Sequence, residues 1–159
     1  MKVSGAVMKT STHTLKVRSS ESPDFIDITT DVESCIRSSG VTTGMVLVFS
    51  KHTTAAVIIQ ESEPLLLEDF KVLLENVASS KERYRHNDFD VRTVHMHENE
   101  CPNGHSHCQH LILGSSETIP LVDGKMPLGE WQRVFMVELD GQKAGQVDFR
   151  EIIVQILGS

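Results

Sequence analysis

Two short, nearly continuous apolar runs restrict the fold of this chain more than any other feature. They cover Met45–Phe49 and Ala55–Ile59. Apolar runs of this length are typical of buried strands. A chain of 159 residues is long enough to enclose them in one domain, because a domain of this size buries roughly two thirds of its unfolded surface. The sequence therefore predicts a single domain, residues 1–159, built around a buried sheet.

Further strands follow from alternating apolar residues and from turn signals. In the strand predicted at Trp131–Leu139, Val134 and Met136 share one face, and Phe135 and Val137 the other. We also predict a strand at His107–Leu113 that forms a hairpin with the strand at 117–122. The other predicted strands cover Thr12–Arg18, Phe25–Ile28 and Val147–Leu157, with turns at Asp123-Gly124 and Asp140-Gly141.

Helical periodicity occurs in two places. Asp31–Ser39 begins at N-cap residues and ends before Gly40. Pro64–Ala78 begins with proline at a favoured first-turn position and repeats apolar residues every three or four positions. Two main flanking helices among eight or nine strands indicate an α+β fold, dominated by antiparallel sheet in a sandwich or barrel-like arrangement.

Composition excludes several classes of partner. The net charge of −7 argues against a nucleic-acid partner, for which a basic stripe is the expected footprint. It also argues against a polybasic membrane anchor, and no apolar run approaches the roughly 20 residues of a membrane span. Three cysteines without regular spacing do not resemble a disulfide framework. We therefore expect a cytoplasmic protein that binds neither nucleic acid nor membrane.

Histidine is the residue type that points to chemistry. Six of the eight histidines lie between His86 and His110, mostly in a long polar segment over residues 79–106. Loops of this length within compact domains are usually functional or disordered. Three imidazoles with one open position form a typical catalytic zinc site. The sequence therefore indicates a histidine-ligated divalent metal, with zinc as the first choice.

The predicted strands select among these histidines. His52 stands between the two apolar runs, and His107 begins a predicted strand. If that strand extends back to His105, both imidazoles point to the same face, because side chains alternate along a strand. A closed Cys/His site of Cys101, Cys108 and these two histidines is an alternative, although its spacing matches no standard zinc finger.

Other polar side chains are less specific. Hydroxyls near turns that could hold an oxyanion occur at Thr53, Thr54, Ser115, Ser116 and Thr118, although ordinary turn chemistry also explains them. Carboxylates beside apolar segments occur at Glu61, Asp69 and Glu138. One of them could act as a general base or orient an imidazole.

Short blocks of sequence, in a fixed order, resemble the YjbQ family, also called UPF0047 or secondary thiamine-phosphate synthase. Together they make the resemblance specific over roughly residues 12–158. The blocks are Lys51–Ala56, Glu61–Pro64, Tyr84–His86, Pro102–His107, Leu113–Pro120, Asp123-Gly124, Leu128–Gln132 and Glu138–Gly141.

The resemblance implies an antiparallel β-domain with flanking helices that forms a homotrimer, with sites near subunit boundaries. It implies that His52, His86 and His107 are the metal ligands. The activity recorded for the family is weak synthesis of thiamine phosphate, in which an aminopyrimidine diphosphate joins a thiazole phosphate with loss of diphosphate.

These observations lead to one main hypothesis and two alternatives. The main hypothesis is a thiamine-phosphate synthase-like transferase with zinc, or magnesium held by a diphosphate substrate. His107 and Glu61 carry the catalysis, and the hydroxyls named above bind a small phosphorylated molecule. The alternatives are a metal-dependent hydrolase of a small phosphorylated substrate and a non-catalytic trimer that binds metal or a small molecule.

The chain departs from the family pattern in two places. Gln142-Lys143 replaces the Pro-Arg that often follows the Glu-x-Asp-Gly turn, so Lys143 keeps the charge but not the bidentate fork of arginine. The segment from His86 to Asn103 is also longer and richer in histidine and glutamate than the family pattern leads us to expect. The second difference bears on how a substrate reaches the site.

Overall fold

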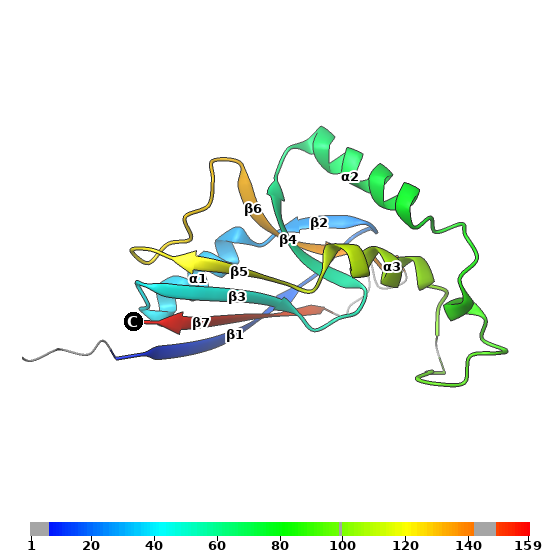
Figure 1. The fold of residues 1–159 in the computed structure, drawn as a ribbon, viewed down its shortest axis with the longest axis horizontal. Helices are drawn as coiled ribbons and strands as arrows, with labels where there is room; N and C mark the ends of the chain where they lie inside the picture. The colour runs from blue at the N-terminus through cyan, green and yellow to red at the C-terminus, as the bar shows by residue number, and fades with distance from the viewer. Residues whose placement is uncertain (1–6, 99, 142–148) are drawn as a thin grey trace, which may run out of the picture.

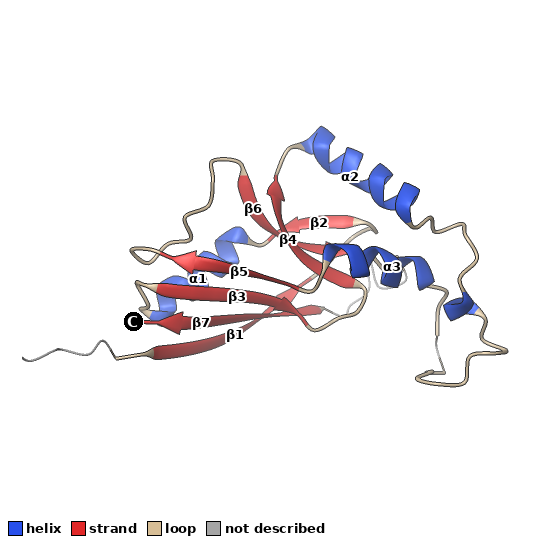
Figure 2. Ribbon diagram, in the orientation of Figure 1, coloured by secondary structure: helices blue, strands red, loops and turns tan. Residues whose placement is uncertain are grey.

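The structure is a computed structural model, and it describes residues 7–98, 100–141 and 149–159. The described residues form seven strands, three α-helices and one short 3₁₀ helix (Figures 1 and 2). The α+β class predicted from the sequence is confirmed. In chain order the elements are β1 (Lys9–Val17), β2 (Asp24–Asp27), α1 (Thr29–Ser39), β3 (Gly44–Ser50), β4 (Ala55–Glu61), α2 (Pro64–Val77), η1 (Arg85–Asn87), α3 (Gly104–Leu113), β5 (Ser116–Leu121), β6 (Gln132–Glu138) and β7 (Arg150–Gly158).

The strands form two antiparallel sheets. One sheet has the order β1-β7-β3-β5 and the other the order β2-β6-β4. The two apolar runs of the sequence, β3 and β4, are consecutive in the chain but belong to different sheets. His52 therefore lies in the short connection by which the chain crosses from one sheet to the other.

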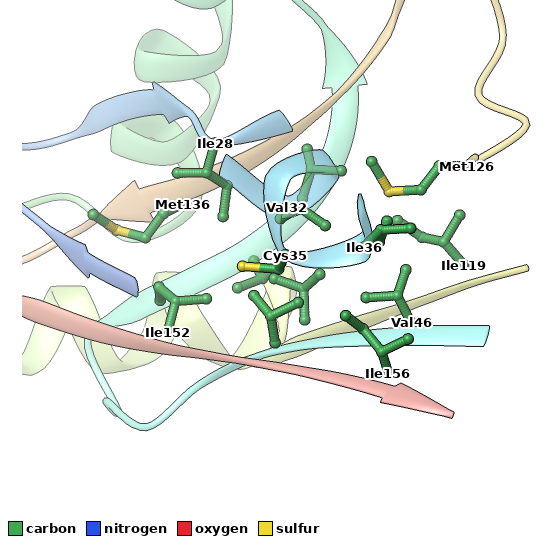
Figure 3. Close-up of a cluster of buried hydrophobic side chains, with 14 of the residues drawn as sticks. Ile28, Val32, Cys35, Ile36, Val46, Ile119, Met126, Met136, Ile152 and Ile156 are labelled. Atoms are coloured by element: carbon green, nitrogen blue, oxygen red, sulfur yellow. The ribbon is translucent and has the colours of Figure 1, made fainter. Parts of the chain in front are cut away.

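The main core fills the space between the two sheets and includes one face of α1 (Figure 3). Strand β7 contributes Ile152, Val154 and Ile156, which alternate along the strand and are fully buried. Helix α1 adds Val32 and Ile36 from its inner face. The core therefore joins both sheets and α1 into one unit.

A second, smaller core lies on the outer face of the β2-β6-β4 sheet. Ala56 from β4 and Phe135 from β6 pack there against Leu74 of α2. The alternation predicted for β6 is confirmed, because Val134 and Met136 lie in the main core and Phe135 and Val137 in the second. Strand β6 is therefore buried on both faces.

The prediction of a strand at His107–Leu113 is wrong. These residues belong to helix α3, and β5 pairs with β3 rather than with a hairpin partner at 107–113. The residues of α3 that face the protein include Ser106 and Gln109, which are polar. The buried face of α3 is therefore not marked by apolar residues, and hydrophobic periodicity did not predict this helix. The prediction that His105 and His107 point to the same face is wrong as well. Residues two positions apart in sequence lie roughly 200° apart around a helix.

Three sequence predictions fall wholly or partly outside the described residues. These concern Gln142, Lys143 and the start of the strand predicted from Val147. Within the described part of the chain, no helix combines the length and the apolar character needed to cross a membrane.

Candidate functional site

The connection between β3 and β4 places His52 at the mouth of a pocket. The pocket has a volume of about 460 Å³, which is within the usual range for small-molecule sites. Nε2 of His52 lies 2.8 Å from the backbone N of Glu151, which donates a hydrogen bond to it. A backbone N–H can only donate, so the proton of the neutral ring is on Nδ1. The pocket is lined by Lys16, Lys51, His52, Glu138, Phe149, Arg150 and Glu151.

A buried ion pair between the two sheets forms the inner wall of this pocket. Arg150 begins β7 and Glu138 ends β6. Nε and Nη2 of Arg150 each donate to a different carboxylate oxygen of Glu138, at 2.6 Å. The two side chains are 11% and 1% exposed. Nη2 of Arg150 also donates at 3.1 Å to Oγ1 of Thr54, a buried hydroxyl behind the wall that the sequence singled out.

The rest of the pocket lining carries both positive and negative charge. Lys51 pairs with Glu151. Lys16 and Arg18 both approach the ring of Phe149, with Nζ of Lys16 at 5.5 Å and Cζ of Arg18 at 4.5 Å from its centroid. Only Lys16 of these two lines the pocket, and it makes no ion pair within the described residues, so its charge is available to an anion.

Burial and charge both act on His52. Burial lowers its pKa, and the neighbouring Arg150 guanidinium lowers it further. The ring is therefore neutral at pH 7 and presents an Nδ1–H donor. A donor of this kind beside several cations suits an anionic group such as phosphate.

A second group of histidines lies where η1 meets α3. The rings of His86 and His107 are 4.6 Å apart between centroids and stand edge to face. Burial lowers the pKa of His107, and the neighbouring His86 lowers it further. A neutral imidazole keeps the lone pair that a metal requires.

Arg92 occupies the space beside this pair. Its Nη1 lies 3.2 Å from Nε2 of His86 and 3.1 Å from Oε2 of Glu100. Its Nη2 donates to the backbone oxygen of His95 at 2.7 Å. The side chains of Arg92 and Glu100 are each 16% exposed. The guanidinium therefore holds the loop between η1 and α3 together.

The structure does not assemble the three predicted metal ligands in one chain. Within residues 7–98, 100–141 and 149–159, no group of three or more His, Cys, Asp or Glu side chains is placed to hold a metal. The rings of His86 and His107 are adjacent, and Nε2 of His86 lies 3.2 Å from Nη1 of Arg92. His52 does not fit as placed, since one of its nitrogens accepts a hydrogen bond and the other carries the proton. A shared site of all three histidines stays a prediction.

The predicted hydroxyls are scattered. Thr54 contacts Arg150 in the wall of the pocket. Ser115 lies with its Oγ 3.2 Å from Nε2 of His110. Ser116 and Thr118 are exposed on β5, Thr53 is exposed in the turn before β4, and none of the three lines the pocket.

Glu61 lies far from the histidines. It is the last residue of β4 and pairs with Gln132, whereas Ala55 at the other end pairs with Glu138. Six residue-to-residue steps along the strand lead from Ala55 to Glu61, which corresponds to roughly 20 Å. Its proposed role in proton transfer stays a prediction that the geometry of a single chain does not support.

Sequence reasoning missed most of the pocket. Arg150, Lys16 and Phe149 were not among the predicted site residues. One usable signal was the placement of single charges at the ends of apolar strands, Arg150 before the run in β7 and Glu138 after the run in β6. Long charged side chains are rarely buried without a partner, so such charges indicate a pair.

Comparisons with known proteins agree on one family. The family model described as "UPF0047 protein YjbQ-like" matches residues 13–159. A UPF0047 protein of Methanothermobacter thermautotrophicus is 37% identical over 139 residues, covering 87% of this chain and 90% of its own. A UPF0047 protein of Archaeoglobus fulgidus is 34% identical and covers 90% of this chain and 98% of its own.

A solved structure supports the same assignment. The crystal structure of a YbjQ-like protein of unknown function from Sulfolobus solfataricus superposes with a TM-score of 0.83 at 31% identity. The match covers 96% of this chain and 100% of that one. The resemblance read from the sequence is therefore confirmed, and the chain belongs to the UPF0047 family of YjbQ-like proteins.

Proposed function

We propose that this chain is an enzyme that binds a small phosphorylated molecule in the His52 pocket. The observation that carries the proposal is the lining of this pocket: an imidazole N–H donor lies beside Lys16, which makes no ion pair among the described residues, and beside Lys51 and Arg150, which pair with Glu151 and Glu138. Cationic side chains that are fixed before the substrate arrives stabilise negative charge that develops during a reaction. A diphosphate leaving group develops such charge.

A divalent metal is the second part of the proposal, with His86 and His107 as its ligands. Two imidazoles favour zinc over magnesium, which prefers oxygen ligands. A metal bound there would supply Lewis-acid stabilisation of phosphate oxygens or acidify a bound water. Asp140 connects the two regions, because its backbone N–H donates to Oε1 of Glu138 at 3.0 Å and because burial lowers the pKa of His107 while the charge of Asp140 raises it.

The reaction proposed is the one that the family resemblance implies. An aminopyrimidine diphosphate joins a thiazole phosphate, a carbon–nitrogen bond forms, and the carbon–oxygen bond to diphosphate breaks. Lys16 would hold the departing diphosphate, and Nδ1–H of His52 would donate to one of its oxygens.

A homotrimer belongs to the same proposal. Helix α2 leaves large apolar side chains in contact with solvent, with Leu65 75%, Val72 60% and Leu73 57% exposed. Leu111 of α3 is 82% exposed. Exposed apolar side chains in such number support contact with further copies of the chain.

Binding of inorganic diphosphate to the full chain, measured by calorimetry, tests the pocket. We expect Lys16→Gln to weaken binding about tenfold, because it removes one charge-assisted contact. Lys9→Gln is the matched control, since Lys9 lies at the other end of β1. No diphosphate binding by the unaltered chain, or equal losses in both variants, would contradict the proposal.

Release of diphosphate from the aminopyrimidine diphosphate tests the reaction. Release that requires the thiazole phosphate supports a synthase. Release without it supports the metal-dependent hydrolase instead, and binding without any release supports the non-catalytic alternative. His52→Gln should lower the rate of release in either enzyme.

A further inference from the structure

Helix α2 leaves a groove on the outer face of the β2-β6-β4 sheet. The structure describes all fourteen residues of α2, and of these only Leu74 is buried. A pocket of about 310 Å³ therefore lies between α2, α3 and the sheet, near the lower end of the range for small-molecule sites. We call this pocket the α2–α3 groove. Eight apolar side chains and two polar ones line it, and none of them lines the His52 pocket.

Aromatic rings form one wall of the α2–α3 groove. The ring centroid of Phe25 of β2 lies 5.7 Å from that of Phe70 of α2 and 6.4 Å from that of Phe135 of β6. Phe135 is buried in the second core, so Phe25 packs between a buried ring and a partly exposed one. Phe25 and Phe70 both line the groove. The groove therefore offers a packed aromatic wall to the apolar body of a ligand.

One carboxylate interrupts this apolar lining. Glu117 lies near the start of β5 and shares the inner face of the strand with Ile119 and Leu121, which are buried. Among the described residues that line the groove, Glu117 is the only charged one. Its carboxylate makes no hydrogen bond or ion pair within the described part of the chain, and burial raises its pKa. A carboxylate in apolar surroundings is stabilised by a cation that pairs with it.

We propose that the α2–α3 groove binds a small apolar amine, whose ammonium pairs with Glu117 and whose hydrocarbon body lies against Phe25 and Phe70. The ammonium supplies the cation that the chain itself does not provide at Glu117, and the apolar body covers the aromatic wall. The proposal is independent of the function proposed above. The two pockets have opposite charge preferences, because the unpaired group in the lining is Lys16 in one and Glu117 in the other.

A second copy of the chain is the competing occupant of the groove. Leu73 and Ile112 line it and are 57% and 60% exposed, so apolar contact alone would suit another copy. The charge favours the amine. An interface that covers Glu117 without a cation would bury an unpaired carboxylate, which is costly, whereas one ammonium neutralises it.

Titration of the full chain with phenethylamine, followed by NMR of the isoleucine methyl groups, tests the proposal. We expect the signals of Ile58 and Ile112, which line the groove, to shift, and that of Ile152 in the main core to stay unchanged. Phenethyl alcohol has the same ring and arm without the charge, and it should bind about tenfold more weakly because it lacks the charge-assisted contact. Phenylacetate carries the opposite charge and should not bind.

Replacing the carboxylate tests its role. Glu117→Gln should weaken the binding of phenethylamine about tenfold and leave that of phenethyl alcohol unchanged. The variant should fold like the unaltered chain, because it removes a charge that has no partner within the described residues. Asp69→Asn is the matched control, since Asp69 is an exposed acid of α2 that does not line the groove.

Three results would overturn the proposal. Equal affinities for phenethylamine and phenethyl alcohol would overturn the amine as the ligand class. Equal losses of affinity in Glu117→Gln and Asp69→Asn would overturn Glu117 as the partner of the ammonium. Methyl signals of Ile58 and Ile112 that ignore all three compounds would overturn the site, and a shift of Ile112 on dilution of the chain alone would then assign the groove to a second copy.

Discussion

Two arginine–glutamate pairs flank the candidate sites, and they are built in different ways. Arg150 and Glu138 come from strands of opposing sheets, and their side chains are almost completely buried. Arg92 and Glu100 come from one loop and lie only eight residues apart. The first pair is fixed by strand register and the second by local contacts alone. The walls of the His52 pocket are therefore fixed by the folded core, whereas the histidine pair lies beside a segment held by its own contacts.

Breaking the buried pair should give the largest effect. Glu138→Gln leaves the Arg150 guanidinium buried without its counter-charge, which typically costs about 3–5 kcal/mol in the free energy of unfolding. Urea unfolding measures this cost. Glu100→Gln, the same change in the loop pair, should cost clearly less, because that pair joins residues of one segment rather than two sheets. Equal costs at the two positions would show that the two pairs are held equally firmly.

The attachment of α3 should give an intermediate effect. Oγ of Ser106 is buried and donates to the backbone oxygen of Leu139 at 2.6 Å. Ser106→Ala should cost about 1–3 kcal/mol in unfolding free energy, because it leaves a buried acceptor without this donor. It should also weaken zinc binding through His107 while leaving diphosphate binding unchanged. Ser38→Ala is the control, since its hydroxyl donates within α1 to the backbone oxygen of Cys35. A parallel loss of diphosphate binding would show that the two sites are not separate.

Acid should destabilise both regions by a smaller amount. Burial lowers the pKa of His52, His107 and His110 from the usual 6.5. The unfolded chain therefore binds protons more readily than the folded one as the pH falls below 6.5. The free energy of unfolding is then lost progressively in that range. After allowance for solvent screening we expect less than about 1 kcal/mol per histidine.

Unfolding in urea at about pH 7.5 and at about pH 6, on either side of the usual histidine pKa, measures this loss. His110→Asn should reduce the difference between the two pH values. The same difference in the variant and the unaltered chain would contradict the assignment of His110.

The contrast between core and loop also explains what the sequence could predict. Helix α2 and the strands β3, β4 and β6 were predicted because their buried residues are apolar and periodic. Helix α3 was missed because Ser106 and Gln109 face the protein, so polar contacts hold a helix face that is usually apolar. The pocket was missed because its walls come from β1, β6 and β7, whose ends meet only through sheet register. The spacing of residues within one segment does not predict which strand ends lie next to each other.

The site predictions divide in the same way. The family assignment was confirmed, whereas the roles of His52, His86 and His107 as metal ligands stay predictions. The sequence could not show that His52 lies in a separate pocket with a hydrogen bond to Glu151. It also could not show that Arg92 lies beside His86, because the residues between them do not define the path of a loop.

Separate binding of phosphate and metal, at two places in one chain, distinguishes this proposal from a single three-histidine site. Nitrogen NMR of the histidine side chains, recorded during separate titrations with diphosphate and with zinc, decides between them. Diphosphate should shift the signals of His52. Zinc should shift those of His86 and His107 while His52 keeps its Nδ1–H form. Zinc that shifts all three histidines together, with one stoichiometry, would overturn the proposal of two sites and establish a three-histidine metal site instead.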